Sequence, residues 1–156
     1  MADHRLLLIR HAKTEQGELD RIRALTERGR RDAAAIGAWM VAADVVPDLA
    51  VVSPATRARQ TWEIAAEAAD MAPPVQIDDD IYSNNVSGLV AIACGIDESV
   101  PTAAIVGHNP SIEEFTARFG GSRVGHVPTG TVVVFDIDGT WADGSIHFAQ
   151  LETSRG

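Results

Sequence analysis

The sequence predicts an α/β fold, a three-layer α/β/α sandwich around a mostly parallel sheet, from three observations. Three short, uninterrupted apolar segments, at residues 6–9, 49–52 and 103–106, are typical of strands that are buried on both faces. Stretches with helical spacing of apolar residues separate these segments, which favours parallel pairing of the strands. Two further apolar stretches, on either side of Asp138-Gly139, predict a C-terminal β-hairpin. Residues 1–156 are expected to form a single domain, because the chain shows no linker or repeat.

The first strand is followed by a polar loop and then by a helix. The loop extends over residues 13–25. Thr26 is placed to cap the helix, because a hydroxyl at this position accepts a backbone N–H of the first turn. Apolar positions then recur at the spacing of one helix face, and they are Ala33, Ile36, Gly37, Met40 and Val41.

The second strand leads directly into a second helix. Ser53-Pro54 predicts an N-cap followed by proline at the first helical position, and the helix is expected to run to about Ala69. Pro73-Pro74 interrupts the helical pattern, and residues 75–77 favour a short strand.

One helix is predicted before the third strand and another after it. Ser83 or Asn85 is placed to cap a brief helix over residues 86–93. Asn109-Pro110 repeats the pattern of cap and proline before a helix that ends at Gly120-Gly121.

Composition limits the partners and the surroundings of the protein. A formal net charge of −9 argues against nucleic acid or an anionic membrane as the main partner. No apolar stretch is long enough to predict a transmembrane helix or a secretory signal. The single cysteine, Cys94, has no partner for an internal disulfide, so a cytoplasmic location is expected. No group of His, Cys and Asp residues has metal-ligand spacing, so neither a metal nor another cofactor is predicted.

A polar block follows each of the three apolar strands, and together these blocks predict a binding pocket. Arg10-His11 follows the first strand, the segment from Ser53 to Arg57 the second, and Gly107-His108 the third. Ligands of open α/β sheets bind beyond the carboxyl ends of the strands, so Arg10, His11, Arg57 and His108 are expected to meet in one site. Residues 1–60 also hold ten of the thirteen Lys and Arg residues, which suits an anionic substrate.

These four side chains are suited to the transfer of a phosphoryl group. Each arginine presents a planar fork of N–H donors that binds two phosphate oxygens at once. His11 is the candidate nucleophile, because a neutral imidazole can attack phosphorus and form a phosphohistidine that water then hydrolyses. The arginines nearby disfavour its protonated form. His108 is expected to donate a hydrogen bond to the phosphoryl oxygens in the transition state.

In these blocks the sequence resembles the histidine phosphatase superfamily, which has the phosphoglycerate mutase-like fold, and within it the SixA-type phosphohistidine phosphatases of bacteria. The superfamily's Arg-His-Gly corresponds to Arg10-His11-Ala12. The likeness continues in the family's order through Leu25-Thr26-Glu27-Arg28-Gly29, Ser53-Pro54, Arg57-Ala58, Gln60-Thr61, Val106-Gly107-His108-Asn109-Pro110 and Pro128-Thr129-Gly130. The resemblance implies that His11 accepts the phosphoryl group, that Arg10 and Arg57 bind phosphate, and that His108 completes the pocket.

Two positions depart from the family's pattern. Ala12 replaces the usual glycine, and its methyl group is expected to narrow the floor of the pocket. Gly17 stands where sugar-phosphate mutases of the superfamily carry an asparagine that contacts the transferring phosphate, which weakens a mutase interpretation.

The general acid of the family is also missing. Mutases and many phosphomonoesterases of the superfamily place a glutamate between the second arginine and the second histidine, because an alkoxide leaving group needs a proton. The carboxylates in this interval match no such motif, and they are Glu63, Glu67, Asp78, Asp79, Asp80, Asp97 and Glu98. An imidazole protonated on its distal nitrogen leaves without an acid, so this absence favours a phosphohistidine substrate.

The sequence therefore predicts a phosphatase that hydrolyses phosphohistidine on a protein, such as a phosphohistidine-carrying signalling domain, through phosphorylated His11. Two alternatives stay open. One is a phosphomonoesterase for a small phosphorylated metabolite. The other is a non-catalytic module that binds a phosphorylated ligand, against which the presence of both His11 and His108 argues.

Several nearby residues are weighed beside the four site residues. Contacts of phosphate with Lys13, Thr14 or the loop Pro128-Thr129-Gly130 stay open. Arg59 lies about 200° round the helix from Arg57 and is assigned to solvent or a surface ion pair. The remaining histidines are expected to be structural or exposed, and they are His4, His126 and His147.

Overall fold

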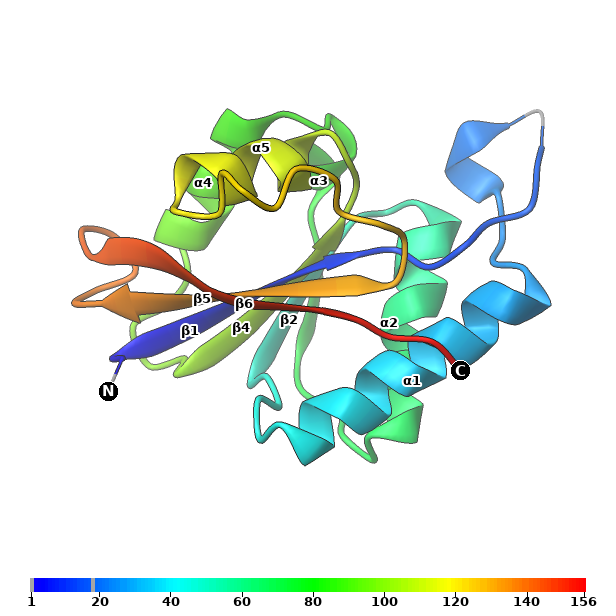
Figure 1. The fold of residues 1–156 in the computed structure, drawn as a ribbon, viewed down its shortest axis with the longest axis horizontal. Coiled ribbons are helices and arrows are strands. Elements are labelled where there is room, and N and C mark those ends of the chain that lie inside the picture. The colour runs from blue at the N-terminus through cyan, green and yellow to red at the C-terminus, as the bar shows by residue number, and fades with distance from the viewer. Residues whose placement is uncertain (1, 18) are drawn as a thin grey trace.

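The computed structural model describes residues 2–17 and 19–156 and has at its centre a six-stranded sheet with the order β3-β2-β4-β1-β5-β6 (Figure 1). The strands are β1 (His4–Arg10), β2 (Leu49–Val52), β3 (Val75–Ile77), β4 (Thr102–Gly107), β5 (Thr131–Asp138) and β6 (Ser145–Thr153). The first four run parallel to one another, whereas β5 and β6 pair antiparallel. The predicted α/β class, the mostly parallel sheet and the C-terminal hairpin are confirmed.

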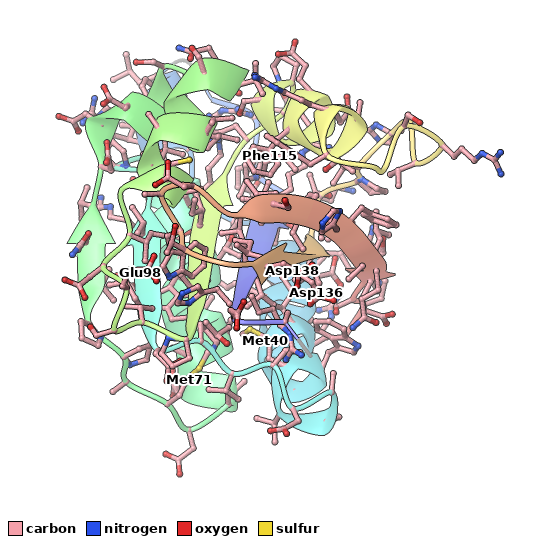
Figure 2. All side chains as sticks on the ribbon, turned by 90° about the vertical axis from the view of Figure 1, so that its left-hand side faces the viewer. Met40, Met71, Glu98, Phe115, Asp136 and Asp138 are labelled. Carbon is pink, nitrogen blue, oxygen red and sulfur yellow. The ribbon has the colours of Figure 1, made fainter. Side chains whose placement is uncertain are left out.

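Helices cover both faces of the sheet, with α1 and α2 on one face and α3, α4 and α5 on the other (Figure 1). They are α1 (Glu27–Ala42), α2 (Thr56–Ala68), α3 (Asp79–Tyr82), α4 (Val86–Cys94) and α5 (Ser111–Arg118). Figure 2 shows Phe115 between α5 and the sheet and Met40 between the sheet and α1, so each layer contributes side chains to a core. Within the described part of the chain, no helix is long and apolar enough to cross a membrane.

Alternate residues of β1 belong to the two cores. Leu6 and Leu8 pack in the core beneath α4 and α5, whereas Leu7 and Ile9 pack in the core beneath α1 and α2. Side chains alternate across a strand, so a central strand that is covered on both faces must be apolar at every position. This requirement is the physical reason for the uninterrupted apolar segment of the sequence.

The register of the parallel strands brings the polar blocks to one edge of the sheet. Arg10 pairs with Gly107, and Val52 pairs with Val106. The residues that follow therefore leave the sheet at the same level. His11 N–H donates to the carbonyl oxygen of Gly107 at 3.1 Å, which extends the parallel ladder by one residue.

Two predicted helix caps are confirmed. The hydroxyl of Thr26 accepts the N–H of Gly29 at 2.9 Å at the start of α1, and the side chain of Asn85 accepts the N–H of Gly88 at 2.8 Å at the start of α4. The loop predicted over residues 13–25 contains the 3₁₀ turn Asp20–Ile22. Glu18 of this loop lies outside the described residues.

Two other predicted caps are wrong. Helix α2 begins at Thr56 after Ala55, two residues later than predicted, so Ser53 does not cap it; the Ser53 hydroxyl lies 2.8 Å from the ring of His108. Helix α5 likewise begins at Ser111 after Pro110. The side-chain amide of Asn109 donates to the carbonyl of Val127 at 2.7 Å instead of capping the helix. In both places the side chain that the local motif assigned to a helix cap instead contacts a residue distant in the sequence, His108 for Ser53 and Val127 for Asn109.

One smaller expectation also needs correction. Val41 is 51% exposed, because it lies beyond the edge of the apolar face of α1. The acidic segment at 78–80 opens α3, and Asp78 caps this helix by accepting the N–H of Asp80 at 2.9 Å. Cys94 is half-buried at the end of α4.

Candidate active site

A cleft of ≈ 630 Å³ opens at the carboxyl edge of the parallel strands, and all four predicted site residues line it. Arg10 and His11 are at the end of β1, Arg57 is in the first turn of α2, and His108 follows β4. The other residues that line the cleft are polar or charged, and they are Lys13, Thr14, Gln16, Asp20, Arg23, Tyr82, Asn84, Asn109 and Thr129. The cleft is therefore suited to a charged ligand.

His11 is a buried, neutral histidine with one free nitrogen. Its residue is 8% exposed, and its Nδ1 lies 2.8 Å from the carbonyl oxygen of Ala12. A carbonyl oxygen can only accept a hydrogen bond, so Nδ1 carries the ring proton and Nε2 keeps its lone pair. Burial, reinforced by the charges of Arg57 and Arg10, lowers the pKa of His11 to about 4. At neutral pH the ring is thus uncharged and has the form of a nucleophile.

His108 lies beside His11, with 5.3 Å between the ring centroids. Burial lowers the pKa of His108 to about 3, and the neighbouring His11 and Arg57 lower it further. Its Nε2 is 2.8 Å from the hydroxyl oxygen of Ser53. This oxygen also accepts the N–H of Ala55 at 3.3 Å, which leaves the hydroxyl proton to be donated to Nε2. In that arrangement Nδ1 carries the ring proton of His108 and is a hydrogen-bond donor.

Arg10 is hydrogen-bonded to the segment that precedes the 128–130 loop. Its Nη1 donates to the carbonyl oxygen of Val127 at 2.9 Å. Glu113, in the first turn of α5, accepts the N–H of Val127 at 2.7 Å and the side-chain amide of Asn109 at 3.0 Å, so the loop is fixed to the helix. Burial lowers the pKa of Arg10, and the charge of Glu113 acts against this shift.

Arg57 is 6% exposed and is paired with Asp20. Its Nη1 donates to the backbone carbonyl of Asp20 at 2.7 Å, and its Nη2 donates to the Asp20 carboxylate at 3.1 Å. The hydroxyl of Tyr82 donates to the same carboxylate at 2.7 Å, and Arg23 donates to its other oxygen at 3.0 Å. The Tyr82 hydrogen bond, followed by the charge and hydrogen bond of Arg57, lowers the pKa of Asp20 to about 2.

Three buried nitrogen atoms of the site have no hydrogen-bond partner among the described residues. They are Nε of Arg10, Nε of Arg57 and Nδ1 of His108. A buried donor that is left unpaired costs roughly 1–3 kcal/mol. An anion with several acceptor oxygens would satisfy such donors, and a phosphoryl group has this chemistry.

Neighbouring elements fix the position of the nucleophile block. The hydroxyl of Thr61 accepts the N–H of Ala12 at 3.0 Å and donates to the carbonyl of Arg57 at 2.7 Å, which joins the end of β1 to α2. The N–H of Gly130 lies 3.2 Å from the carbonyl of Arg10 and 3.1 Å from that of His11. Gly130 has φ of +72°, a conformation that favours glycine. The 128–130 loop therefore approaches the site, as the sequence left open.

The other candidate residues lie either in the cleft or outside it. Lys13 and Thr14 line the cleft. Arg59 is exposed outside it, and its Nε donates to the carbonyl of Pro54 at 3.2 Å. His4 is buried and bonded to Val100 and Glu98, whereas His126 and His147 are exposed. None of the carboxylates considered between Arg57 and His108 is among the residues that line the cleft.

The methyl group of Ala12 does not narrow the cleft, contrary to expectation. Ala12 is fully buried and packs in a small cluster with Leu25 and Ala33. Its side chain therefore closes the gap between the end of β1 and α1, and it is absent from the lining of the cleft.

Sequence reasoning missed Asp20, Arg23 and Tyr82. The resemblance places the general acid between Arg57 and His108, whereas Asp20 precedes that interval in a loop without a recognisable motif. One pattern could have identified the region. Asp20 and Arg23, an acid and a base three positions apart, stand just before Leu25-Thr26, which is part of the resemblance to the family.

Comparisons with known proteins identify relatives of this chain. The model of the histidine phosphatase superfamily (branch 1) matches residues 6–85. An uncharacterised protein of Mycobacterium tuberculosis is 30% identical over 147 residues, covering 86% of this chain and 90% of that protein. A solved structure from Nakamurella multipartitia, provisionally assigned as the phosphohistidine phosphatase SixA, is 26% identical with a TM-score of 0.85. That match covers 97% of this chain and 96% of the other.

A further solved structure has the same fold at lower identity. It comes from Escherichia coli and is provisionally assigned as an alpha-ribazole-5'-P phosphatase. It is 19% identical with a TM-score of 0.72, and the match covers 98% of this chain and 99% of that one. Because a fold can serve several substrates, this likeness concerns the architecture alone.

Proposed function

We propose that this chain, a phosphatase that belongs to the histidine phosphatase superfamily, hydrolyses phosphohistidine on a protein through a phosphorylated His11. The observation that carries this substrate class is the set of donors around the acid in the cleft. Asp20 is the one carboxylic acid among the described residues that line the cleft, and its carboxylate accepts hydrogen bonds from Tyr82, Arg57 and Arg23, which keep its pKa low. Asp20 therefore has no proton to give to an alkoxide at neutral pH, whereas a protonated imidazole needs none.

In the first step, the lone pair of His11 Nε2 attacks phosphorus and the P–N bond of the substrate breaks. The substrate ring, protonated on its distal nitrogen, leaves as neutral imidazole. His11 then carries the phosphoryl group on Nε2 and its original proton on Nδ1, where the carbonyl of Ala12 accepts a hydrogen bond. Arg10, Arg57 and His108 are the proposed donors to the phosphoryl oxygens, on which charge is spread during transfer.

In the second step, water attacks the phosphoryl group of His11 and the P–Nε2 bond breaks. The product is dihydrogen phosphate, which receives both protons of the water molecule, and His11 returns to its neutral form with the lone pair on Nε2. The lowered pKa of His11 supports this cycle, because the free ring is ready for attack without first losing a proton.

The architecture around the cleft supports a protein substrate. The chain between Arg57 and His108 forms the remainder of α2, then β3, α3, α4 and β4, all of which belong to the sheet and its helical layers. This interval contains no inserted segment that would cap the cleft. An uncapped cleft admits a phosphorylated side chain from a protein surface and gives a small metabolite little contact area.

Parallel turnover assays test the proposal. The purified protein is given a phosphohistidine protein, an aryl phosphate, sugar phosphates and phosphoglycerates under the same conditions. We expect the highest kcat/KM for phosphohistidine, an intermediate value for the aryl phosphate and no mutase activity. Faster turnover of an alkyl phosphate would replace this proposal with a phosphomonoesterase, and binding without turnover would indicate a non-catalytic module.

A further inference from the structure

We propose that Asp20 is a specificity-determining residue, whose carboxylate accepts the N–H on the distal ring nitrogen of a phosphohistidine substrate. This inference rests on the proposed function. A phosphorylated imidazole differs from a phosphate ester in its second ring nitrogen, which must be protonated if the ring is to leave as neutral imidazole. A carboxylate beside this nitrogen favours the protonated form.

The Asp20 carboxylate has one acceptor position to spare. A carboxylate offers about four lone-pair sites. Oδ2 accepts the Tyr82 hydroxyl at 2.7 Å and Arg57 Nη2 at 3.1 Å, and Oδ1 accepts Arg23 Nη2 at 3.0 Å. Within the described residues, the second site of Oδ1 is therefore available. The side chain is 55% exposed, so a group of the substrate can reach it.

Asp20 also lies on the side of the cleft where a leaving group is expected. The nucleophile and the leaving group take opposite sides of phosphorus in an in-line transfer. His11, at the floor, is 8% exposed, whereas the Asp20 side chain is 55% exposed at the mouth. Arg57 is 6% exposed and donates through Nη2 to the exposed Asp20 carboxylate at 3.1 Å, so it joins the buried part of the cleft to the mouth.

The carboxylate discriminates between substrates by its charge. During transfer from phosphohistidine, the distal proton stays on the departing ring and Asp20 neither gains nor loses a proton. The P–N bond of the substrate breaks as the bond from phosphorus to His11 Nε2 forms. An ester leaving group becomes an anion in the same position, and the negative charge of Asp20 disfavours it. One side chain thus assists imidazole and opposes an alkoxide.

An Asp20→Asn variant tests this role, because asparagine keeps the shape of the side chain and removes the charge. We expect kcat/KM for a phosphohistidine peptide to fall by about 10- to 100-fold, the range for a hydrogen bond to a charged group. Turnover of 4-nitrophenyl phosphate should fall by a clearly smaller factor, because its leaving group has no distal N–H for Asp20 to accept, and the only loss expected is the weaker hold of Asp20 on Arg57. Asp79→Asn is the matched control, because the Asp79 side chain is 83% exposed, pairs with Arg21 at 3.6 Å and lies outside the cleft.

The pH dependence of kcat separates this role from a structural one. If Asp20 stabilises the protonated ring in the bound substrate, the alkaline limb of kcat for phosphohistidine moves to lower pH in Asp20→Asn, and no such shift occurs with 4-nitrophenyl phosphate. An equal loss for both substrates would mean that Asp20 merely orients Arg57, which would overturn the inference. If the wild-type protein turns over phosphohistidine no faster than esters, the proposed function itself fails.

Discussion

The floor and the mouth of the cleft are built in different ways. His11 and His108, at the floor, leave adjacent parallel strands, are 8% and 4% exposed, and have pKa values lowered to about 4 and about 3. Asp20 and Arg23, at the mouth, come from a loop, carry charge and have side chains that are 55% and 23% exposed. The difference indicates that the sheet fixes the groups proposed to react, while the loop carries the groups proposed to select the substrate.

His11→Ala tests the floor with the largest expected effect. We expect turnover of every substrate to be lost while the fold remains, because His11 follows β1 and packs in none of the three apolar cores. Acid-labile phosphate should be trapped on the wild-type protein and not on the variant. His147→Ala is the control, since this exposed histidine on β6 faces Asp138. Hydrolysis by His11→Ala at the wild-type rate would disprove the covalent mechanism.

Arg57→Lys tests the link between floor and mouth. Lysine supplies a point charge without the planar fork, so it cannot bind Asp20 and a phosphoryl group as arginine does. We expect kcat/KM to fall on the order of 10²-fold or more, comparable to the loss of one preorganised transition-state donor. Arg59→Lys, on the exposed side of the same helix, should be nearly silent in the same assay. Greater sensitivity at Arg59 would show that the wrong arginine has been assigned.

Ser53→Ala gives a smaller effect that is confined to the floor. The variant removes the hydroxyl beside His108 Nε2, so the ring loses the contact that orients it. We expect kcat/KM to fall by about 3- to 10-fold for esters and phosphohistidine alike, in line with the loss of one neutral hydrogen bond. Ser87→Ala on α4 is the control, because this exposed hydroxyl donates to the side chain of Asn85 and does not line the cleft. A fall in kcat/KM restricted to phosphohistidine would show that the floor, and not the mouth, selects the substrate.

The ionisation of the floor should stay almost unchanged down to about pH 5. Nuclear magnetic resonance of the His11 and His108 rings should show neutral imidazoles throughout, because their pKa values are about 4 and about 3. The unfolded chain binds these protons near pH 6.5, so the free energy of unfolding falls as the pH drops from 6.5 towards 4. The loss at pH 5 is at most about 2 kcal/mol for each histidine. Urea denaturation at several pH values measures the free energy of unfolding of wild type and His11→Ala. If this free energy changed equally with pH in both proteins, the lowered pKa of His11 would be contradicted.

The sequence was sufficient to predict the floor but not the mouth. The apolar segment at 49–52 corresponds residue for residue to β2, because a strand covered on both faces leaves a local pattern. Parallel register then brings the following polar residues together. Asp20 contacts Arg57 and Tyr82, which are 37 and 62 positions away, and such contacts leave no periodicity in the chain.

The misassigned cap at Ser53 has the same physical origin. A serine before proline has the local chemistry of an N-cap, and the sequence cannot indicate that its hydroxyl contacts a histidine 55 positions later. The predicted roles of Arg10, His11, Arg57 and His108 themselves stay proposals. The structure brings these side chains into one cleft, and turnover measurements decide what they do there.

The contact between His11 Nδ1 and the carbonyl of Ala12 has a consequence for the regiochemistry of the proposed phosphoenzyme. Phosphohistidine exists as two positional isomers, which differ in stability and in their phosphorus resonances. With Nδ1 engaged by the backbone at 2.8 Å, the proposed phosphoryl group would be attached to His11 through Nε2, whichever isomer the substrate protein carries. The same positional isomer, with the same phosphorus resonance, would therefore be trapped on His11 with every substrate.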